Sequence, residues 1–298
     1  MMAELILGLI RANLAAAAAV VVVLILRKPV RAHFGAHLAY MLWLIVPLVA
    51  AASLLPGRPA DEATSQVNAL AAAVQAWSVH ALSPETTLTL FSIWLRGAAV
   101  IALLIMLGQW RFLKKAAQGQ AGPAIIGVLH PRIVMPADFE TRFTPHEQAV
   151  IRVHERAHIA RHDARANALV GLLQCLCWFN PLVHVAAALI RIDQELACDA
   201  TVIERLPGER RRYAQAMLKT QLGGAALPLG CRWLAHPLED RVAMLAQPMP
   251  GPLARAVGLG AVSLIGLTAA AAVWTVHPPQ PAPPPADPPV LFMNLNHP

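Results

Sequence analysis

Four long apolar stretches most limit the folds open to this chain. They cover roughly residues 3–26, 38–55, 88–107 and 256–276. A helix of about 20 apolar residues is long enough to cross the hydrocarbon core of a bilayer. Hydrophobic residues make up 57% of the chain and charged residues 14%, which is too apolar for an ordinary soluble domain. The sequence therefore predicts a mostly α, polytopic membrane protein with four transmembrane helices in the lipid bilayer.

Basic residues beside these stretches indicate how the chain is oriented. They follow the first and the third stretch: Arg27, Lys28 and Arg31, then Arg111, Lys114 and Lys115. Only Arg58 is basic in the connection 56–87. Because basic loops stay in the cytoplasm, the N-terminus is expected outside and residues 111–255 inside. The first stretch is interpreted as a retained anchor and not as a signal peptide, since its basic residues follow the apolar run.

These assignments divide the chain into four parts. Residues 1–108 are expected to hold three transmembrane helices, with an external loop at about 56–87. Residues 109–255 are expected to form a cytoplasmic α+β domain and residues 256–276 the fourth transmembrane helix. Residues 277–298 are a proline-rich tail, which is expected to be external and extended.

The cytoplasmic part carries most of the charge. Of the 24 Lys and Arg residues, 18 lie in 111–255, where 12 of the 17 Asp and Glu residues also lie. Such a mixed-charge segment fits the cytoplasmic face of a membrane better than a DNA-binding surface, so no direct nucleic-acid partner is expected. All four cysteines lie in the same segment, which indicates a reducing compartment and no disulfide framework.

Two local patterns predict the elements at the start of this domain. The β-prone runs 124–129 and 132–135 predict a small hairpin, and the first of them is a candidate edge strand for binding a substrate peptide. A helix start follows, with Thr144 as N-cap, Pro145 in the first turn and Glu147 closing a capping box. The capped helix carries the motif that most directly indicates a function.

That motif is "VHERAHIARHD", residues 153–163. On a helix, His154 and His158 lie on one face and can bind one ion, while Glu155 lies beside them and can act on a water molecule. The alternative is a solvated polar helix face that happens to carry two histidines. His162 and Asp163 are expected to be capping groups or hydrogen-bonding partners and not ligands.

A third ligand has to come from elsewhere in the chain. The position six residues after His158, where metzincins have a histidine, is Ala164. Downstream, Glu195 and Asp199 lie four residues apart in "RIDQELACDA". The apolar segment between the two motifs is interrupted at Pro181, which favours a bend. Two helices near 163–179 and 182–199 would run out and back by similar distances and return Glu195 to the histidines.

The two quoted segments, "HERAHIARHD" and "CWFNPLVHVAAALIRIDQELACDA", together resemble the BlaR/MecR-type membrane metallopeptidases, the antirepressor family of bacterial β-lactam sensing. The resemblance implies a gluzincin-like site in which His154, His158 and Glu195 bind Zn2+ and Glu155 is the catalytic base. It also implies that Asp199 is a partner of a ligand histidine. The extracellular penicillin-binding domain of the β-lactam sensors is expected to be lacking, which leaves the inducing signal open.

The expected function is that of a zinc endopeptidase of the bacterial inner membrane. It would transmit a signal by cleaving a protein substrate, such as a cytoplasmic transcriptional repressor. The alternatives are a quality-control zinc protease of membrane proteins and a non-catalytic transducer with a structural zinc. Tyr213 and His184 are candidates for a second oxyanion donor beside the metal.

Overall fold

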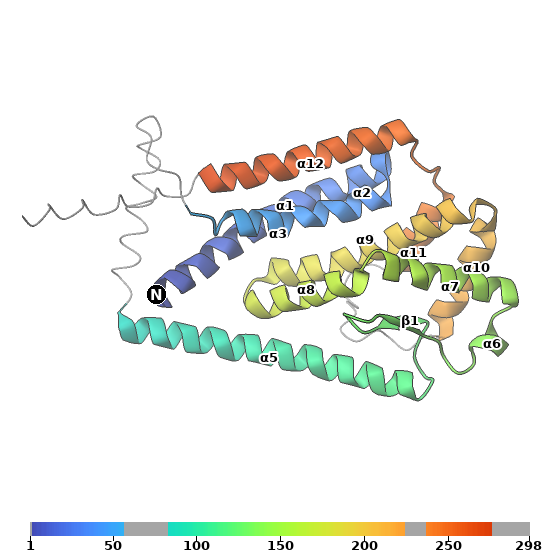
Figure 1. Cartoon of the computed structure of the whole chain (residues 1–298), viewed down its shortest axis with the longest axis horizontal. Coiled ribbons are helices and arrows are strands. Elements are labelled where there is room, and N and C mark those ends of the chain that lie inside the picture. The colour runs from blue at the N-terminus through green and yellow to red at the C-terminus, as the bar shows by residue number, and fades with distance from the viewer. Residues whose placement is uncertain (1, 57–82, 224–236, 276–298) are drawn as a thin grey trace, which may run out of the picture.

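The computed structural model describes residues 2–56, 83–223 and 237–275 and is mostly helical (Figure 1). The membrane-proximal elements are α1 (Met2–Phe34), α2 (Ala36–Met41), η1 (Leu42–Leu44), α3 (Ile45–Ala52), α5 (Pro84–Ala117) and α12 (Pro252–Thr275). The other elements are β1 (Ala124–Ile126), β2 (Arg132–Val134), α6 (Phe139–Arg142), α7 (Pro145–Ala160), α8 (Asp163–Leu176), α9 (Pro181–Arg205), η3 (Pro207–Glu209), α10 (Arg210–Gly223) and α11 (Pro237–Ala246). Most of the predicted loop 56–87 and all of the tail 277–298 lie outside the described residues.

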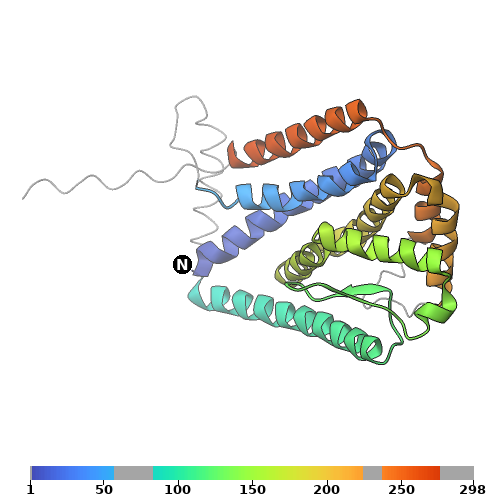
Figure 2. The same ribbon diagram turned by 45° about the vertical axis from the view of Figure 1, so that its right-hand side comes forward.

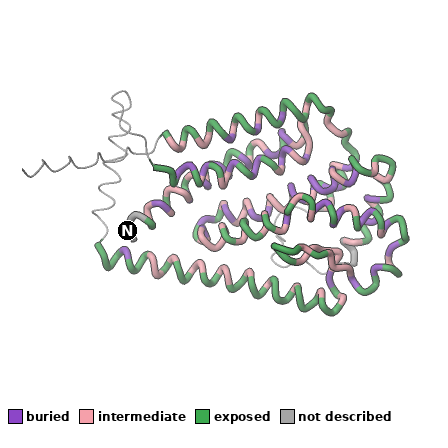
Figure 3. Tube along the Cα trace, in the orientation of Figure 1, coloured by how far each residue is buried: buried purple, intermediate pink, exposed green. Residues whose placement is uncertain are grey.

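Within the described residues, three helices are long and apolar enough to cross a membrane: α1, α5 and α12. Residue Thr87 is the only one of α5 that is buried (Figure 3), as expected of a helix whose surroundings are lipid. The second predicted span is a shorter apolar run, Ala36–Ala52, in which α2, η1 and α3 follow one another. The prediction that the chain crosses the membrane four times therefore stays a prediction.

The N-terminal helices pack together with α12. In Figure 1, α1, α3 and α12 lie in one layer, and each of these helices contacts the other two. Buried apolar side chains fill the space between them, among them Val23, Leu42, Ile45 and Val262. We call α1, α2, η1 and α3 the N-terminal unit.

The helices α8 and α9 form the hairpin that Pro181 predicts, and this hairpin lies between α1 and α5 (Figure 2). At its tip, the Asn180 amide donates to Oδ1 of Asn13 on α1 at 2.9 Å. On the other side, the Trp178 indole donates to the Trp94 carbonyl of α5 at 3.1 Å. A Cβ atom at Gly97 would lie 2.0 Å from that indole, so only glycine permits this approach. The hairpin tip is therefore fixed to both neighbouring helices.

The small sheet has two antiparallel strands, with Ile125 of β1 opposite Ile133 of β2. The strands are shorter than the predicted runs because Gly127 turns the chain with φ of +91°. The predicted capping box of α7 is present, with Thr144 accepting from the Glu147 amide and Glu147 accepting from the Thr144 amide. Lys219 of α10 adds an ion pair to Glu147 at 2.7 Å.

The basic clusters after the first and third stretches lead to a topology prediction. Reporter fusions after Lys115 and Gln221 should read as cytoplasmic, while fusions near Ala72 and after Pro285 should read as external. Paired alkaline phosphatase and fluorescent-protein fusions would measure both sides. An external signal at Gln221 would contradict the orientation given to residues 109–255.

Candidate metal centre

The two histidines of α7 point their rings at one position. His154 and His158 are both buried, and their Nε2 atoms are 3.1 Å apart. Two nitrogen ligands at about 2.0–2.1 Å from one tetrahedral zinc ion would be separated by about 3.3 Å. The spacing of four residues on α7 thus gives a donor pair that fits one zinc ion.

The carboxylate of Glu195 on α9 completes the cluster. One of its oxygens lies 3.5 Å from Nε2 of His154, and the other lies 3.5 Å from Nε2 of His158. The three ligand atoms lie within 4.8 Å of one another. Two imidazoles and one carboxylate are a ligand set typical of catalytic zinc sites, which leave one position for water or substrate. The residues present therefore fit zinc.

Asp163, at the start of α8, fixes the protonation of the His158 ring. The Nδ1 atom of His158 lies 2.7 Å from Oδ2 of Asp163. A carboxylate only accepts hydrogen bonds, so Nδ1 carries the proton and the Nε2 lone pair faces the cluster. The prediction that Asp163 is a partner of His158 and not a ligand stays a prediction. His162 is the N-cap of α8 with a positive φ of 59° and makes no side-chain capping bond.

His154 is fixed in the same way, but through an intermediate residue. Tyr213 of α10 donates to Asp199, and its oxygen lies 2.7 Å from Nδ1 of His154. The predicted link between Asp199 and a ligand histidine therefore runs mainly through Tyr213, since the direct distance from His154 is 3.5 Å. The Tyr213 hydroxyl is committed to these two groups, which removes it as an oxyanion donor.

Arg241 of α11 binds the two acidic residues of α9, and the sequence patterns did not reveal it. Its Nε and Nη2 atoms donate to the two oxygens of Asp199 at 2.8 and 2.7 Å. Its Nη1 atom lies 3.2 Å from Oε2 of Glu195. Burial alone would raise the pKa of Glu195, but the charges of Arg241 and His158 hold this pKa well below its usual range. Arg241 thus keeps the Glu195 carboxylate ionised, as a metal ligand requires.

Glu155 follows His154 on α7 and is buried beside the cluster. Burial raises the pKa of Glu155, while the positive charges of His154 and His158 oppose the shift. A raised pKa makes a carboxylate a better proton acceptor. This environment suits a general base.

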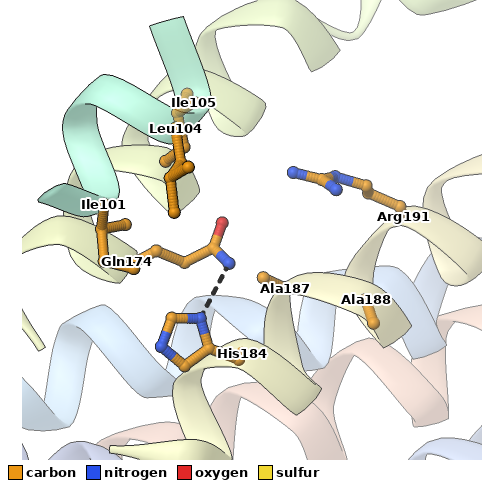
Figure 4. A pocket seen from close by; sticks show the side chains of 8 residues that line it. All are labelled: Ile101, Leu104, Ile105, Gln174, His184, Ala187, Ala188 and Arg191. Carbon is orange, nitrogen blue, oxygen red and sulfur yellow. Dashed lines mark hydrogen bonds between the residues drawn. The ribbon is translucent and has the colours of Figure 1, made fainter. Parts of the chain in front are cut away.

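Two other groups near the hairpin do not join the cluster. His184 lines a cavity of about 160 Å³ between α5, α8 and α9, where its ring accepts from Gln174 and donates to the Trp178 carbonyl (Figure 4). It lies eleven residues before Glu195 on α9, which is about 16 Å along the helix, too far to contact the same reacting group. Cys198 lies 3.1 Å from Nδ1 of His158, but burial raises the pKa of its thiol to about 11, so it remains a protonated neighbour.

Cys175, Cys177 and Cys198 are free thiols, and Cys231 lies outside the described residues.

Comparison with known proteins finds a matching family model and similar proteins. A family model described as BlaR1 peptidase M56 matches residues 7–245. The regulatory protein BlaR1 of Bacillus licheniformis is 32% identical over 98 residues, which is 33% of this chain and 16% of that protein. The methicillin resistance mecR1 protein of Staphylococcus aureus is 29% identical over 101 residues, 34% of this chain and 17% of that protein. The matched segment is thus about a sixth of the length of either relative, and no solved structure matches.

Proposed function

Because this chain belongs to the BlaR1 peptidase M56 family, we propose that it is a membrane-anchored zinc endopeptidase that transmits a signal by cutting a cytoplasmic, repressor-like protein. The convergence of His154, His158 and Glu195 on one point supports the proposal most directly. The presence of buried Glu155 next to them supports catalysis over a purely structural zinc site, because a structural site needs ligands and has no use for a base.

The proposed mechanism assigns each residue a task. Zinc, when held by His154, His158 and Glu195, would supply a Lewis acid with an open coordination position. Glu155 would accept a proton from the attacking water and pass it to the leaving amine. Asp163 and the Tyr213–Asp199 pair would keep the two imidazoles in the ligating tautomer.

The substrate chain would lie along the small sheet. The strand β1 contacts α7, which carries the histidines, and it pairs only with β2 among the described residues. A peptide could therefore add to the other edge of β1 as a further strand, with its backbone hydrogen bonds giving affinity. Because backbone hydrogen bonds do not depend on side chains, the bound peptide needs no particular sequence. This mode of binding suits either a repressor or a misfolded protein as the substrate.

The candidate spans α1, α5 and α12 support a location in a membrane. We propose that they anchor the chain in the bacterial inner membrane, with the metal centre on the cytoplasmic side, because the basic residues cluster at that end of α1 and α5.

Removal of zinc tests the peptidase activity. The full chain, purified in detergent, should cut an unstructured reporter such as casein, and 1,10-phenanthroline should abolish the cleavage because the Lewis acid is lost. Adding back zinc should restore it. Undiminished cleavage by protein shown to be free of metal would contradict the proposal, and so would a zinc-loaded protein that cuts neither casein nor any protein of its host.

A further inference from the structure

A tyrosine of the N-terminal unit reaches the candidate metal centre through one intermediate residue. The Tyr40 hydroxyl of α2 lies 3.2 Å from Oδ1 of Asp163. The other oxygen of the same carboxylate, Oδ2, accepts the 2.7 Å hydrogen bond from Nδ1 of His158. The chain Tyr40–Asp163–His158 therefore connects a helix of the N-terminal unit to a proposed zinc ligand.

The position and direction of the Tyr40 hydroxyl are fixed by its surroundings. The amide nitrogen of Gln194 donates to the Tyr40 oxygen at 3.0 Å. The amide oxygen of Gln194 accepts from Asn167 at 3.0 Å, which sets the orientation of the amide. Because the Tyr40 oxygen accepts from Gln194, its one proton is left for Asp163. The guanidinium of Arg161 lies over the Tyr40 ring at 4.7 Å and holds the ring in place.

The N-terminal unit is also attached to α9 just before Glu195. Arg27 of α1 makes two hydrogen bonds to buried Asp193, at 2.8 and 2.9 Å. The Trp43 indole of η1 donates to the same carboxylate at 2.8 Å. This attachment holds α9 against the N-terminal unit, so a displacement of α1 and α2 acts on Tyr40 and its partners directly.

The two histidines differ in what fixes them. His154 is held through Tyr213 and Asp199 by Arg241, and all of these residues belong to the segment between α7 and α11. His158 is held by Asp163, which is in turn held by the N-terminal unit. A change in the position of the N-terminal unit would thus reach His158 through Tyr40 and Asp163. The ion pair of the same unit to α11, from Arg31 to Asp240 beside Arg241, is longer at 3.9 Å.

We propose that Tyr40 is a positioning residue of the metal centre, through which the N-terminal unit sets the orientation of Asp163 and the zinc affinity of His158. The inference rests on the proposed function, in which zinc is bound by His154, His158 and Glu195. Partners that orient a ligand histidine typically contribute about 10- to 100-fold to metal affinity or activity. The consequence is a route from membrane helix to active site made of two hydrogen bonds.

Zinc affinity provides the test, measured on the full chain in detergent by competition with a chromophoric chelator. Tyr40→Phe removes the hydroxyl and keeps the ring under Arg161, so we expect zinc binding to weaken by about 10-fold. Asp163→Asn should weaken it by at least as much. If Tyr40 acts through Asp163, the double variant should bind zinc no more weakly than Asp163→Asn alone, because the two changes break one chain of contacts.

Trp43→Phe is the matched control. It also removes one donor that the N-terminal unit gives to a carboxylate of the hairpin, but Asp193 keeps its two hydrogen bonds from Arg27, so α9 stays attached to that unit. Its zinc affinity should equal that of the unmodified chain even if its thermal stability falls. The proposal would be overturned if Tyr40→Phe and Trp43→Phe had the same zinc affinity. It would also be overturned if the losses of affinity from Tyr40→Phe and Asp163→Asn were additive in the double variant.

The outcome also separates this proposal from the proposed function. An unmodified chain that binds zinc without cutting protein would refute the peptidase, while the affinity cycle would still decide the role of Tyr40. An unmodified chain without zinc affinity would refute both.

Discussion

Glu155→Gln is expected to lose about two to four orders of magnitude in peptidase rate while it keeps its zinc, because a positioned general base contributes about 10²- to 10⁴-fold. The amide has nearly the shape of the carboxylate but accepts no proton from water at neutral pH. The ligands His154, His158 and Glu195 are unchanged, so the metal content should stay at that of the unmodified chain. The cleavage rate and the zinc content are measured on the same preparation, so that a loss of rate can be separated from a loss of metal.

The control for this variant is Glu140→Gln, the same chemical change on an exposed residue of α6, which should leave the rate unchanged. The inactive variant should also hold its substrate, so the proteins that co-purify with it from the native host identify the target. A small winged-helix repressor would support signalling, and a mixture of misfolded membrane proteins would support quality control. Full activity of Glu155→Gln would exclude the catalytic role and favour a non-enzymatic transducer.

The second large effect concerns the metal itself. The purified chain should contain about one zinc ion per molecule, as expected for one three-ligand site. Glu195→Ala leaves two imidazoles, and the Nη1 atom of Arg241 then lies next to the vacated position without the Glu195 carboxylate to balance it. Both changes weaken cation binding, so zinc should be almost absent after dialysis, as in His154→Ala. Atomic emission spectroscopy measures the metal content directly.

Glu204→Ala is the matched control for Glu195→Ala. Glu204 is also a carboxylate of α9, but it pairs with Arg255 at 2.8 Å and contacts His37 at 3.7 Å, not His154 or His158. This variant should retain about one zinc ion per chain. Unreduced zinc in Glu195→Ala would show that the third ligand is another residue.

The sequence predicted those parts of the fold that depend on short spacings. The capping box of α7 and the turn before Pro181 are visible in neighbouring residues, and helical periodicity places His154 and His158 on one face. From these follow a hairpin and the approach of α9 to α7. The sequence predicts a span at the second apolar stretch, but the helical run there, Ala36–Ala52, is shorter than the three candidate spans. The sequence did not predict this length, because apolar composition does not show where a helix ends.

The parts that the sequence did not predict are contacts between distant segments. Tyr40 precedes Asp163 by 123 residues, and Arg241 follows Asp199 by 42. No periodicity relates such residues, since their distance in space depends on how whole helices pack. Tyr213 was considered for a different role, because its spacing from Asp199 does not reveal that His154 lies on its other side. A buried Asp199 requires a cation nearby to balance its charge. The segment contains many arginines, and the sequence does not show which of them lies next to Asp199.

The contacts of Arg241 also have a consequence for how the protein is made. Arg241 lies 46 residues after Glu195 in the sequence, so at about 5–20 residues per second a ribosome reaches it roughly 2–9 s later. Until then, buried Asp199 lacks the cation that balances its charge, and burying an unpaired carboxylate is strongly unfavourable. The metal centre is therefore expected to close only after nearly all of its domain has been synthesised. Until then, the residues that would bind zinc are not held in the arrangement that the proposed peptidase needs.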